Sequence, residues 1–155
     1  MPSWQWKAFA ELTLEELYAV LALRQEVFVV EQRSIYQDVD GLDPSSLHLL
    51  AHEGEGPERL LCAYLRILPP DVKFPSAASL GRVVTSPRAR GRGLGRELTE
   101  RGLARLEALY PDATIRISAQ DYLRAFYTSL GFIAEGEVYD EDGIPHIEMS
   151  RPPRR

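Results

Sequence analysis

One stretch, from Gly81 to Leu98, constrains the fold of this chain more than any other. It reads as a short strand of β-branched residues, a turn broken by Pro87, a loop rich in glycine and arginine, and the start of a helix. A loop with glycine at alternate positions lets a ligand approach its backbone N–H groups, and a helix N-terminus favours an anion. Arginine side chains add guanidinium groups suited to phosphate. The loop residues that we predict to bind a phosphate are Arg88, Arg90, Gly91, Arg92, Gly93, Leu94, Gly95 and Arg96.

The spacing of this loop differs from two common phosphate-binding patterns. A P-loop continues with Lys and Ser or Thr after its second glycine, whereas Gly95 is followed by Arg96 and Glu97. The dinucleotide fingerprint requires a third glycine where this chain has Arg96. A nucleotide-phosphate site is therefore disfavoured. An ordinary glycine-rich turn with solvated arginines remains an alternative at this point.

The composition indicates one soluble globular domain spanning residues 1–155, of which 151–155 read as a frayed basic tail. Hydrophobic residues make up 45% of the chain and charged residues 26%. The net charge of −5 argues against a general nucleic-acid binder, and no apolar run is long enough to span a membrane. A single cysteine, Cys62, and a start without a signal-peptide pattern favour the cytoplasm. The scattered histidines show no metal-ligand spacing, so we expect no metal.

The charges are distributed unevenly along the chain. Seven arginines and two glutamates lie between residues 82 and 105, whereas eight acids and Arg33 alone lie between residues 26 and 58. A further six acids and no Lys or Arg lie between 135 and 148. This polarity suits an anionic cofactor at one place and a cationic substrate at another, although solvated surfaces would explain it equally well.

The periodicity predicts ten elements in the order β-α-β-β-β-α-β-α-β-β. Thr13 and Glu16 form a capping box, so a helix starts there and runs to about residue 30 or 32, with Leu14, Leu17, Tyr18 and Leu21 on its apolar face. The second helix follows the glycine-rich loop, with Gly102 placed for close packing on the sheet, and the third covers 121–130. The predicted strands are 4–10, 47–52, 60–68, 79–85, 113–118, 132–139 and 144–149.

A second motif lies about thirty residues beyond the loop. Gln120 to Phe132 reads as a strand end followed by a helix that contains Phe126, Tyr127, Leu130 and Gly131. Together the two motifs resemble those of the GCN5-related N-acetyltransferases (GNAT). Residues 28–32, 36–40 and 143–149 further resemble the ElaA-type branch of that family, so the resemblance covers nearly the whole chain. Gln120 departs from the asparagine that many members carry.

The resemblance implies an α/β fold with a twisted mixed sheet of about seven strands, which splays between its fourth and fifth strands to hold acetyl-CoA. It also implies that backbone groups of Val83 and Val84 contact the pantetheine arm. The N–H groups of residues 90–96 would hold the pyrophosphate, and further cofactor contacts would come from Gln120, Tyr122 and Phe126. A peptide-like pantetheine would thus pair with the splayed strands.

The implied activity is transfer of an acetyl group to a primary amine, which attacks the thioester directly. The resemblance makes the N–H of Val84 the oxyanion donor and Tyr127 the general acid, although an aromatic at helical spacing is more often part of a core. His146 and Glu148 alternate on the last predicted strand, so either is a candidate base or a member of a sheet pair. His48 and His52 read as structural or exposed, and Cys62 as a buried strand residue.

The acceptor would be a small-molecule or protein amine. The candidate substrate-side residues are Glu26, Glu31, Gln32, Asp38 and Asp40, which would attract a cationic amine or simply cap a surface loop. The protein would be a monomer or a homodimer. A non-catalytic module that binds acyl-CoA or a partner is the alternative function.

Overall fold

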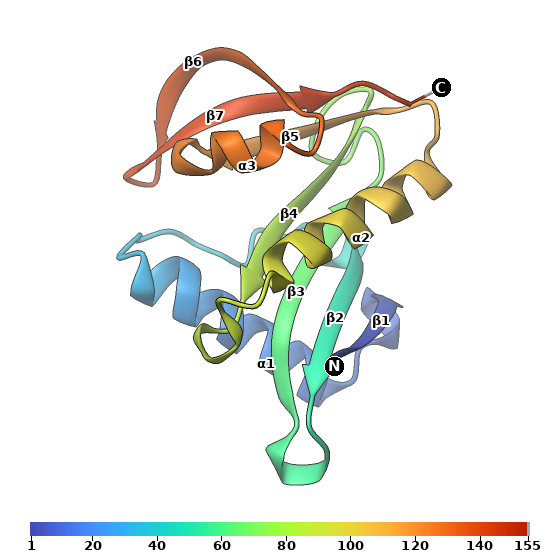
Figure 1. Cartoon of the computed structure of the whole chain (residues 1–155), viewed down its shortest axis with the longest axis vertical. Helices are drawn as coiled ribbons and strands as arrows, with labels where there is room; N and C mark the ends of the chain where they lie inside the picture. The colour runs from blue at the N-terminus through green and yellow to red at the C-terminus, as the bar shows by residue number, and fades with distance from the viewer. Residues whose placement is uncertain (155) are drawn as a thin grey trace.

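The computed structural model describes residues 1–154 and contains the predicted elements in the predicted order (Figure 1). Short 3₁₀ turns separate several of them, and the proposed tail residue Arg155 lies outside the described residues. The strands are β1 Ser3–Ala8, β2 Leu47–Glu53, β3 Leu60–Leu68, β4 Ala77–Thr85, β5 Thr114–Gln120, β6 Ile133–Glu141 and β7 Ile144–Arg151. The helices are α1 Leu14–Arg24, its continuation η2 Gln25–Glu31, α2 Leu94–Leu109 and α3 Arg124–Thr128.

The strands form one mixed sheet in the order β1-β2-β3-β4-β5-β7-β6. All neighbours are antiparallel except β4 and β5, which pair in parallel at only two positions, Ala77 with Thr114 and Ala78 with Ile115. Beyond these pairs the two strands diverge. The sheet therefore splays at the place that the family resemblance predicted, and Figure 1 shows β5, β6, β7 and α3 set apart from the rest of the molecule.

Helices α1 and α2 cover opposite faces of the β2–β4 part of the sheet. Leu98 and Leu106 of α2 join Leu49 and Leu65 in the larger core, whereas α1 packs over Leu50 and its neighbours on the other face. Alternate residues of a strand point to opposite faces, which is why positions 49 and 50 serve different cores. The α2 contact is close because Gly102 has no side chain: a Cβ there would lie 2.9 Å from Leu65. The predicted role of Gly102 is thus confirmed.

The predicted apolar face of α1 is only partly correct, because Leu17 and Leu21 are half-buried but its other members are exposed. Leu14 and Tyr18 are 86% and 79% exposed, while Val20, Leu23 and Val27 are buried. The helix carries apolar residues on more than one face, so the 3.6-residue period alone does not choose between them. The capping box is confirmed, because the Thr13 hydroxyl accepts from the Glu16 N–H and the Glu16 carboxylate accepts from the Thr13 N–H.

The first helix changes its geometry at Gln25. From there to Glu31 the chain forms the wider turns of a π-helix, as in the bond from the Gln32 N–H to the Val27 carbonyl five residues earlier, 3.0 Å long. Such turns occur often at functional sites. Here the widened segment brings Glu31 and Gln32 beside the splayed strands.

The C-terminal prediction also needs correction. Arg151 belongs to β7 and is buried; its guanidinium donates to the Leu130 carbonyl and pairs with Glu107 at 2.7 Å. The tail therefore begins at Pro152 and not at Arg151, where we had placed its start. No helix among the described residues is long and apolar enough to cross a membrane.

Candidate active site

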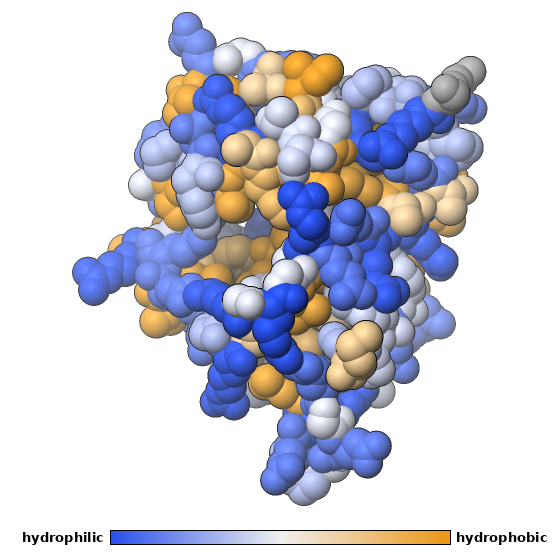
Figure 2. Space-filling view, viewed as in Figure 1, coloured by the Kyte–Doolittle hydropathy of each residue, from blue (hydrophilic) through white to orange (hydrophobic). Residues whose placement is uncertain are grey.

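A cavity of about 460 Å³ lies where β4 and β5 diverge. One wall is the edge of β4 from Leu80 to Thr85, and the other is the edge of β5 from Ile117 to Gln120. The η2 segment, the β6–β7 hairpin, Lys73 and Tyr127 also contribute to the lining. The molecule is hollowed between its two parts, with polar side chains around the opening and apolar ones deeper inside (Figure 2). Because β4 and β5 do not pair here, their facing backbone groups are available to a ligand.

The glycine-rich loop, residues 88–96, leads into the N-terminus of α2 and is hereafter the phosphate loop. Gly91 and Gly93 have φ angles of +82° and +73°, which favour glycine. Gly95 has no such angle, and a Cβ there would make only an ordinary contact of 3.9 Å with Thr85. Glycine in a helix costs roughly 1 kcal/mol relative to alanine. Neither backbone strain nor packing explains why residue 95 is a glycine. The close approach of a ligand to the first turn of α2 would explain it.

Two arginines of the phosphate loop form bidentate pairs with glutamates. Arg90 donates to both carboxylate oxygens of Glu31 at 2.9 and 2.7 Å, and Arg92 does the same to Glu53 at 3.0 and 2.6 Å. We call these the surface pairs, since each of the four side chains is between 24% and 51% exposed. The hydrogen bonds lower the pKa of both glutamates. The forks are thus oriented for an oxyanion, and water can reach them.

The remaining loop arginines differ in their contacts. Arg88 is exposed. Arg96 donates to the Ser129 hydroxyl at 2.8 Å and lies 5.2 Å from the centre of the Phe126 ring. The loop and the C-terminal half of α3 therefore contact one another.

Tyr127 of α3 lines the cavity and is only 7% exposed. Its ring packs edge-on against Phe126 and Phe132, with centroid distances of 5.2 and 5.7 Å. Burial raises the pKa of its phenol to about 12, so the hydroxyl keeps its proton at neutral pH. The side chain thus combines core packing with a place at the cavity, and the two readings of the sequence do not exclude one another.

Other predicted cofactor residues also line the cavity. They are Val83, Val84, Gln120 and Tyr122. Gln120 exchanges amide hydrogen bonds with Gln32 at 3.0 and 3.4 Å, and Ser34 donates to the Asp142 carbonyl at 2.7 Å. These two contacts tie the segment after α1 to the opposite wall. The segment therefore bounds the cavity between Glu31, which pairs with Arg90 of the phosphate loop, and the β6–β7 hairpin.

Strand β4 carries a bulge beside this wall. Tyr64 pairs with Val84 and Arg66 pairs with Gly81, so β4 has one residue more than β3 over this stretch. Arg82 lies in the bulge with a φ of +51°, unusual for a residue other than glycine. The bulge directs the Arg82 side chain toward the loop that follows η2.

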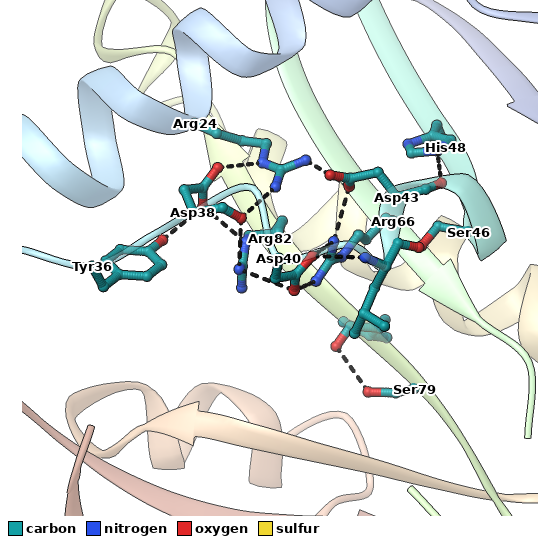
Figure 3. Close-up of polar contacts among 12 residues, drawn as sticks. Arg24, Tyr36, Asp38, Asp40, Asp43, Ser46, His48, Arg66, Ser79 and Arg82 are labelled. Atoms are coloured by element: carbon teal, nitrogen blue, oxygen red, sulfur yellow. Dashed lines mark hydrogen bonds and ion pairs between the residues drawn. The ribbon is translucent and has the colours of Figure 1, made fainter. Parts of the chain in front are cut away.

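The acidic residues of that loop form a buried ion network, shown in Figure 3. Arg24 contacts Asp38 and Asp43 at 2.7 Å each, and Arg66 contacts Asp43 at 2.9 Å. Arg24 and Arg66 are 0% and 1% exposed. We define the buried network as Arg24, Arg66, Arg82, Asp38, Asp40 and Asp43, which gives three positive and three negative charges.

Our assignment of Asp38 and Asp40 to the substrate needs correction. Asp38 is bound by Arg24 and by Arg82 at 2.8 Å, and it also accepts from the Tyr36 hydroxyl. Asp40 is bound by Arg66 and Arg82. Burial alone would raise the pKa of Asp40, but the hydrogen bonds and charge of Arg66 outweigh it and hold that pKa well below its usual range. The carboxylates fasten the loop to the sheet and have no net charge left for an amine.

The remaining predicted residues separate into two groups. His146 and Glu31 line the cavity. Glu148 does not, because it lies beside Arg116 at 3.4 Å, and Glu26 also lies outside the lining. The shared face that we expected for residues 146 and 148 therefore does not bring both to the site.

His146 has a defined orientation at the cavity. Its Nδ1 lies 2.7 Å from the Ile144 carbonyl, and its Nε2 lies 3.3 Å from the Glu141 carboxylate. A carbonyl only accepts, so Nδ1 must carry a proton. That leaves Nε2 as the ring nitrogen with a lone pair toward the Glu141 carboxylate and the cavity.

Residues predicted to be structural are indeed buried. The ring of His48 lies between the Tyr64 hydroxyl at 2.7 Å and the Asp43 carbonyl at 3.0 Å. Burial lowers the pKa of His48 and of His52. Cys62 is 0% exposed, and burial raises the pKa of its thiol to about 11. The described residues contain no group of three or more His, Cys, Asp or Glu able to hold a metal ion.

Sequence reasoning missed Arg24, Arg66, Arg82 and Lys73. A signal existed for the first two, because Arg24 stands between the apolar residues Leu23 and Val27, and Arg66 interrupts an apolar strand. A charge at such a position requires a buried partner, and the nearby acidic loop was available. Lys73 lines the cavity from the β3–β4 connection and showed no pattern of its own.

Comparisons with known proteins agree with this geometry. A family model described as an acetyltransferase (GNAT) domain matches residues 71–152. Protein ElaA of Escherichia coli is 42% identical over 97% of each chain, and its crystal structure superposes with a TM-score of 0.88. An acyl-CoA N-acyltransferase from Pseudomonas aeruginosa is 50% identical, with a TM-score of 0.89 over 97% of this chain and 99% of the other. A Bacillus subtilis acetyltransferase solved in complex with CoA shares the fold, with a TM-score of 0.64, 17% identity and coverage of 98% of this chain and 99% of the other.

Proposed function

Because this chain belongs to the GNAT acetyltransferase family and resembles its ElaA-type members, we propose that it transfers the acetyl group of acetyl-CoA to a primary amine. One observation carries the proposal: three features line the same cavity. They are the unpaired edges of β4 and β5, Arg90 of the phosphate loop, and Tyr127. An extended thioester with an anionic end matches each of these features. The CoA held by the Bacillus subtilis protein of the same fold supports this choice of cofactor.

The diphosphate would bind the phosphate loop. First-turn N–H groups of α2 have no acceptor within the helix and lie at the positive end of its dipole. Gly93 and Gly95 leave room for an anion to reach them. Arg90 and Arg92 would exchange their glutamates for phosphate oxygens, since guanidinium binds both groups with the same fork. Pantetheine would then extend along β4 past Val83 and Val84.

Transfer needs a neutral amine near the thioester carbonyl. An ordinary alkyl ammonium has a pKa of about 10.4, so a base must remove a proton. We assign this role to Nε2 of His146, which lines the cavity while Nδ1 is held by the Ile144 carbonyl. The new C–N bond forms as the carbonyl π electrons move to oxygen, and the N–H of Val84 would stabilise the oxyanion.

Collapse of the intermediate breaks the C–S bond and releases a thiolate, while the positively charged nitrogen gives its extra proton to solvent and becomes the amide. Tyr127 would protonate it, because its raised pKa keeps the phenol neutral until the sulfur becomes charged. The phenol then recovers a proton from solvent. The products are an N-acetyl amine and free CoA.

Turnover with a panel of primary amines tests the proposal, with release of free thiol as the signal. The wild type should release thiol faster with at least one amine than by background hydrolysis. Tyr127→Phe keeps the ring and its edge-on contacts, so it should bind acetyl-CoA normally yet react roughly 10²–10⁴-fold more slowly. Thiol release that no amine accelerates would instead favour the non-catalytic acyl-CoA-binding alternative.

A further inference from the structure

We call the part of the cavity lined by Arg82, Lys73 and the β6–β7 hairpin its acceptor end. The charges there are not those that the acidic sequence predicted. The three carboxylates of the buried network are matched by its three arginines, as Figure 3 shows for the residues around Asp38 and Asp40. Arg82, which lines the cavity, belongs to this balanced set. A cationic acceptor therefore finds no excess negative charge on the β4 side.

One cation on this side is left over. Lys73 lines the cavity with an exposed side chain, and its ammonium forms no ion pair with any described residue. The Lys73 Nζ lies over the Phe74 ring, 5.7 Å from its centre. Desolvation and the nearby positive charges of Arg82 and Arg66 lower the pKa of Lys73, which places the ammonium in a positive field that an anion would relieve. Two carboxylates, Glu141 and Asp40, act on Lys73 in the opposite direction. Asp40 is already bound by Arg66 and Arg82, and Glu141 lies beside His146.

The facing wall has the opposite character. Glu141 and Asp142 lie on the β6–β7 hairpin together with His146, and all three line the cavity. Glu141 is held by contacts with His146 and with Ser118, which also bonds Tyr139. The acceptor end therefore has a surplus positive charge on the β3–β4 side and carboxylates with a base on the other. This arrangement fits a molecule with an amine at one end and an anion at the other.

We propose that the acceptor is a small amino carboxylate, such as a free amino acid, whose carboxylate binds Lys73 while its amine faces His146. This rests on the proposed function. A carboxylate is favoured over phosphate because one ammonium, without a second unpaired guanidinium beside it, supplies a single charge.

Matched acceptors test this most directly. The kcat/KM for acetyl transfer is measured with a series of amino acids, with the corresponding amino acid amides and with the decarboxylated amines. The wild type should prefer the best amino acid to its amide by roughly 10- to 100-fold, the range for loss of one charged hydrogen bond. Lys73→Met should remove that preference mainly through KM, and Lys73→Glu should reverse it toward the decarboxylated amine or a diamine.

Two controls keep the test sharp. Arg59→Glu reverses a charge in the exposed β2–β3 turn, outside the cavity lining, and should leave the preference unchanged. Calorimetric titration of acetyl-CoA into Lys73→Glu should give the wild-type affinity. Equal kcat/KM for an amino acid and its amide in the wild type, or an undiminished preference in Lys73→Met, would overturn the inference while leaving acetyl transfer intact. Absence of amine-dependent thiol release with every compound would overturn the proposed function as well.

Discussion

The arginines behind the cavity and those of the phosphate loop form ion pairs of similar length but very different exposure. Arg24 meets Asp38 at 2.7 Å with side chains 0% and 7% exposed, and Arg90 meets Glu31 at 2.7 Å with side chains 41% and 44% exposed. Distance alone would rank the two pairs as equals. Exposure separates them, because breaking a buried pair leaves a desolvated charge without a partner, whereas water replaces a lost partner at the surface.

This difference teaches what each group of pairs does. The buried network joins α1, β3 and β4 to the loop of residues 33–44. It thereby holds in place the cavity wall that contains Arg82. The surface pairs hold their guanidinium groups in a defined orientation, yet they can exchange a carboxylate for a phosphate at little cost. We therefore assign the first group to the architecture and the second to the cofactor.

Arg24→Met should have the largest effect on stability. It keeps much of the aliphatic volume but leaves Asp38 and Asp43 each without one ion-pair partner. We expect the free energy of unfolding to fall by roughly 3–5 kcal/mol, as when one member of a buried pair is removed. Urea denaturation measures it. Arg90→Met is the matched control, and a loss of the same size there would contradict the distinction between the two groups.

Acid should destabilise the fold by protonating the carboxylates of the buried network. The folded-state pKa values of Asp40 and Asp43 are lowered, so their contribution is complete above the unfolded value of about 3.9 and is lost as the pH falls through the folded values. The unfolding free energy should therefore decline below about pH 5.

Asp40→Asn tests the assignment of this pH dependence. The variant should lose roughly 1.5–3 kcal/mol at pH 7, toward the lower end because the Asp40 side chain is 25% exposed, and its stability should vary less between pH 5 and pH 3. A curve parallel to that of the wild type would place the acid sensitivity elsewhere.

The double variant Arg90→Ala, Arg92→Ala should have the smallest effect on stability. Exposed pairs contribute about 0–1 kcal/mol each, so the melting temperature should scarcely change. The affinity for CoA should nevertheless fall, and its dependence on salt concentration should weaken, since two phosphate contacts are lost. A wild-type salt dependence in titrations of the variant would show that these forks do not reach the phosphates.

The sequence was informative where local patterns decide the structure. The order of the elements, the capping box at Thr13, the close packing at Gly102 and the start of α2 at the phosphate loop follow from spacing and from glycine. The splay between β4 and β5 was predicted from family resemblance, and the pairing of only two positions between them agrees.

The sequence was less informative where partners are distant in the chain. Arg24, Arg66 and Arg82 come from three elements and meet on a loop that reads as an acidic surface. The face of α1 that is buried is likewise the one that contains Arg24, whose partners Asp38 and Asp43 lie outside the helix. The sequence could not predict a role for Lys73, because that role depends on whether the nearby carboxylates are already bound by other side chains.

Binding of acetyl-CoA by wild type and Gly93→Val tests the central claim most directly. A Cβ at position 93 would meet no protein atom, but the φ of +73° there opposes a β-branched side chain, and the added atoms would occupy the space above the first turn of α2. Calorimetric titration should give saturable one-to-one binding to the wild type and no measurable binding to the variant, provided circular dichroism shows that the variant is folded. Equal affinities would contradict the assignment of this loop to the cofactor phosphates.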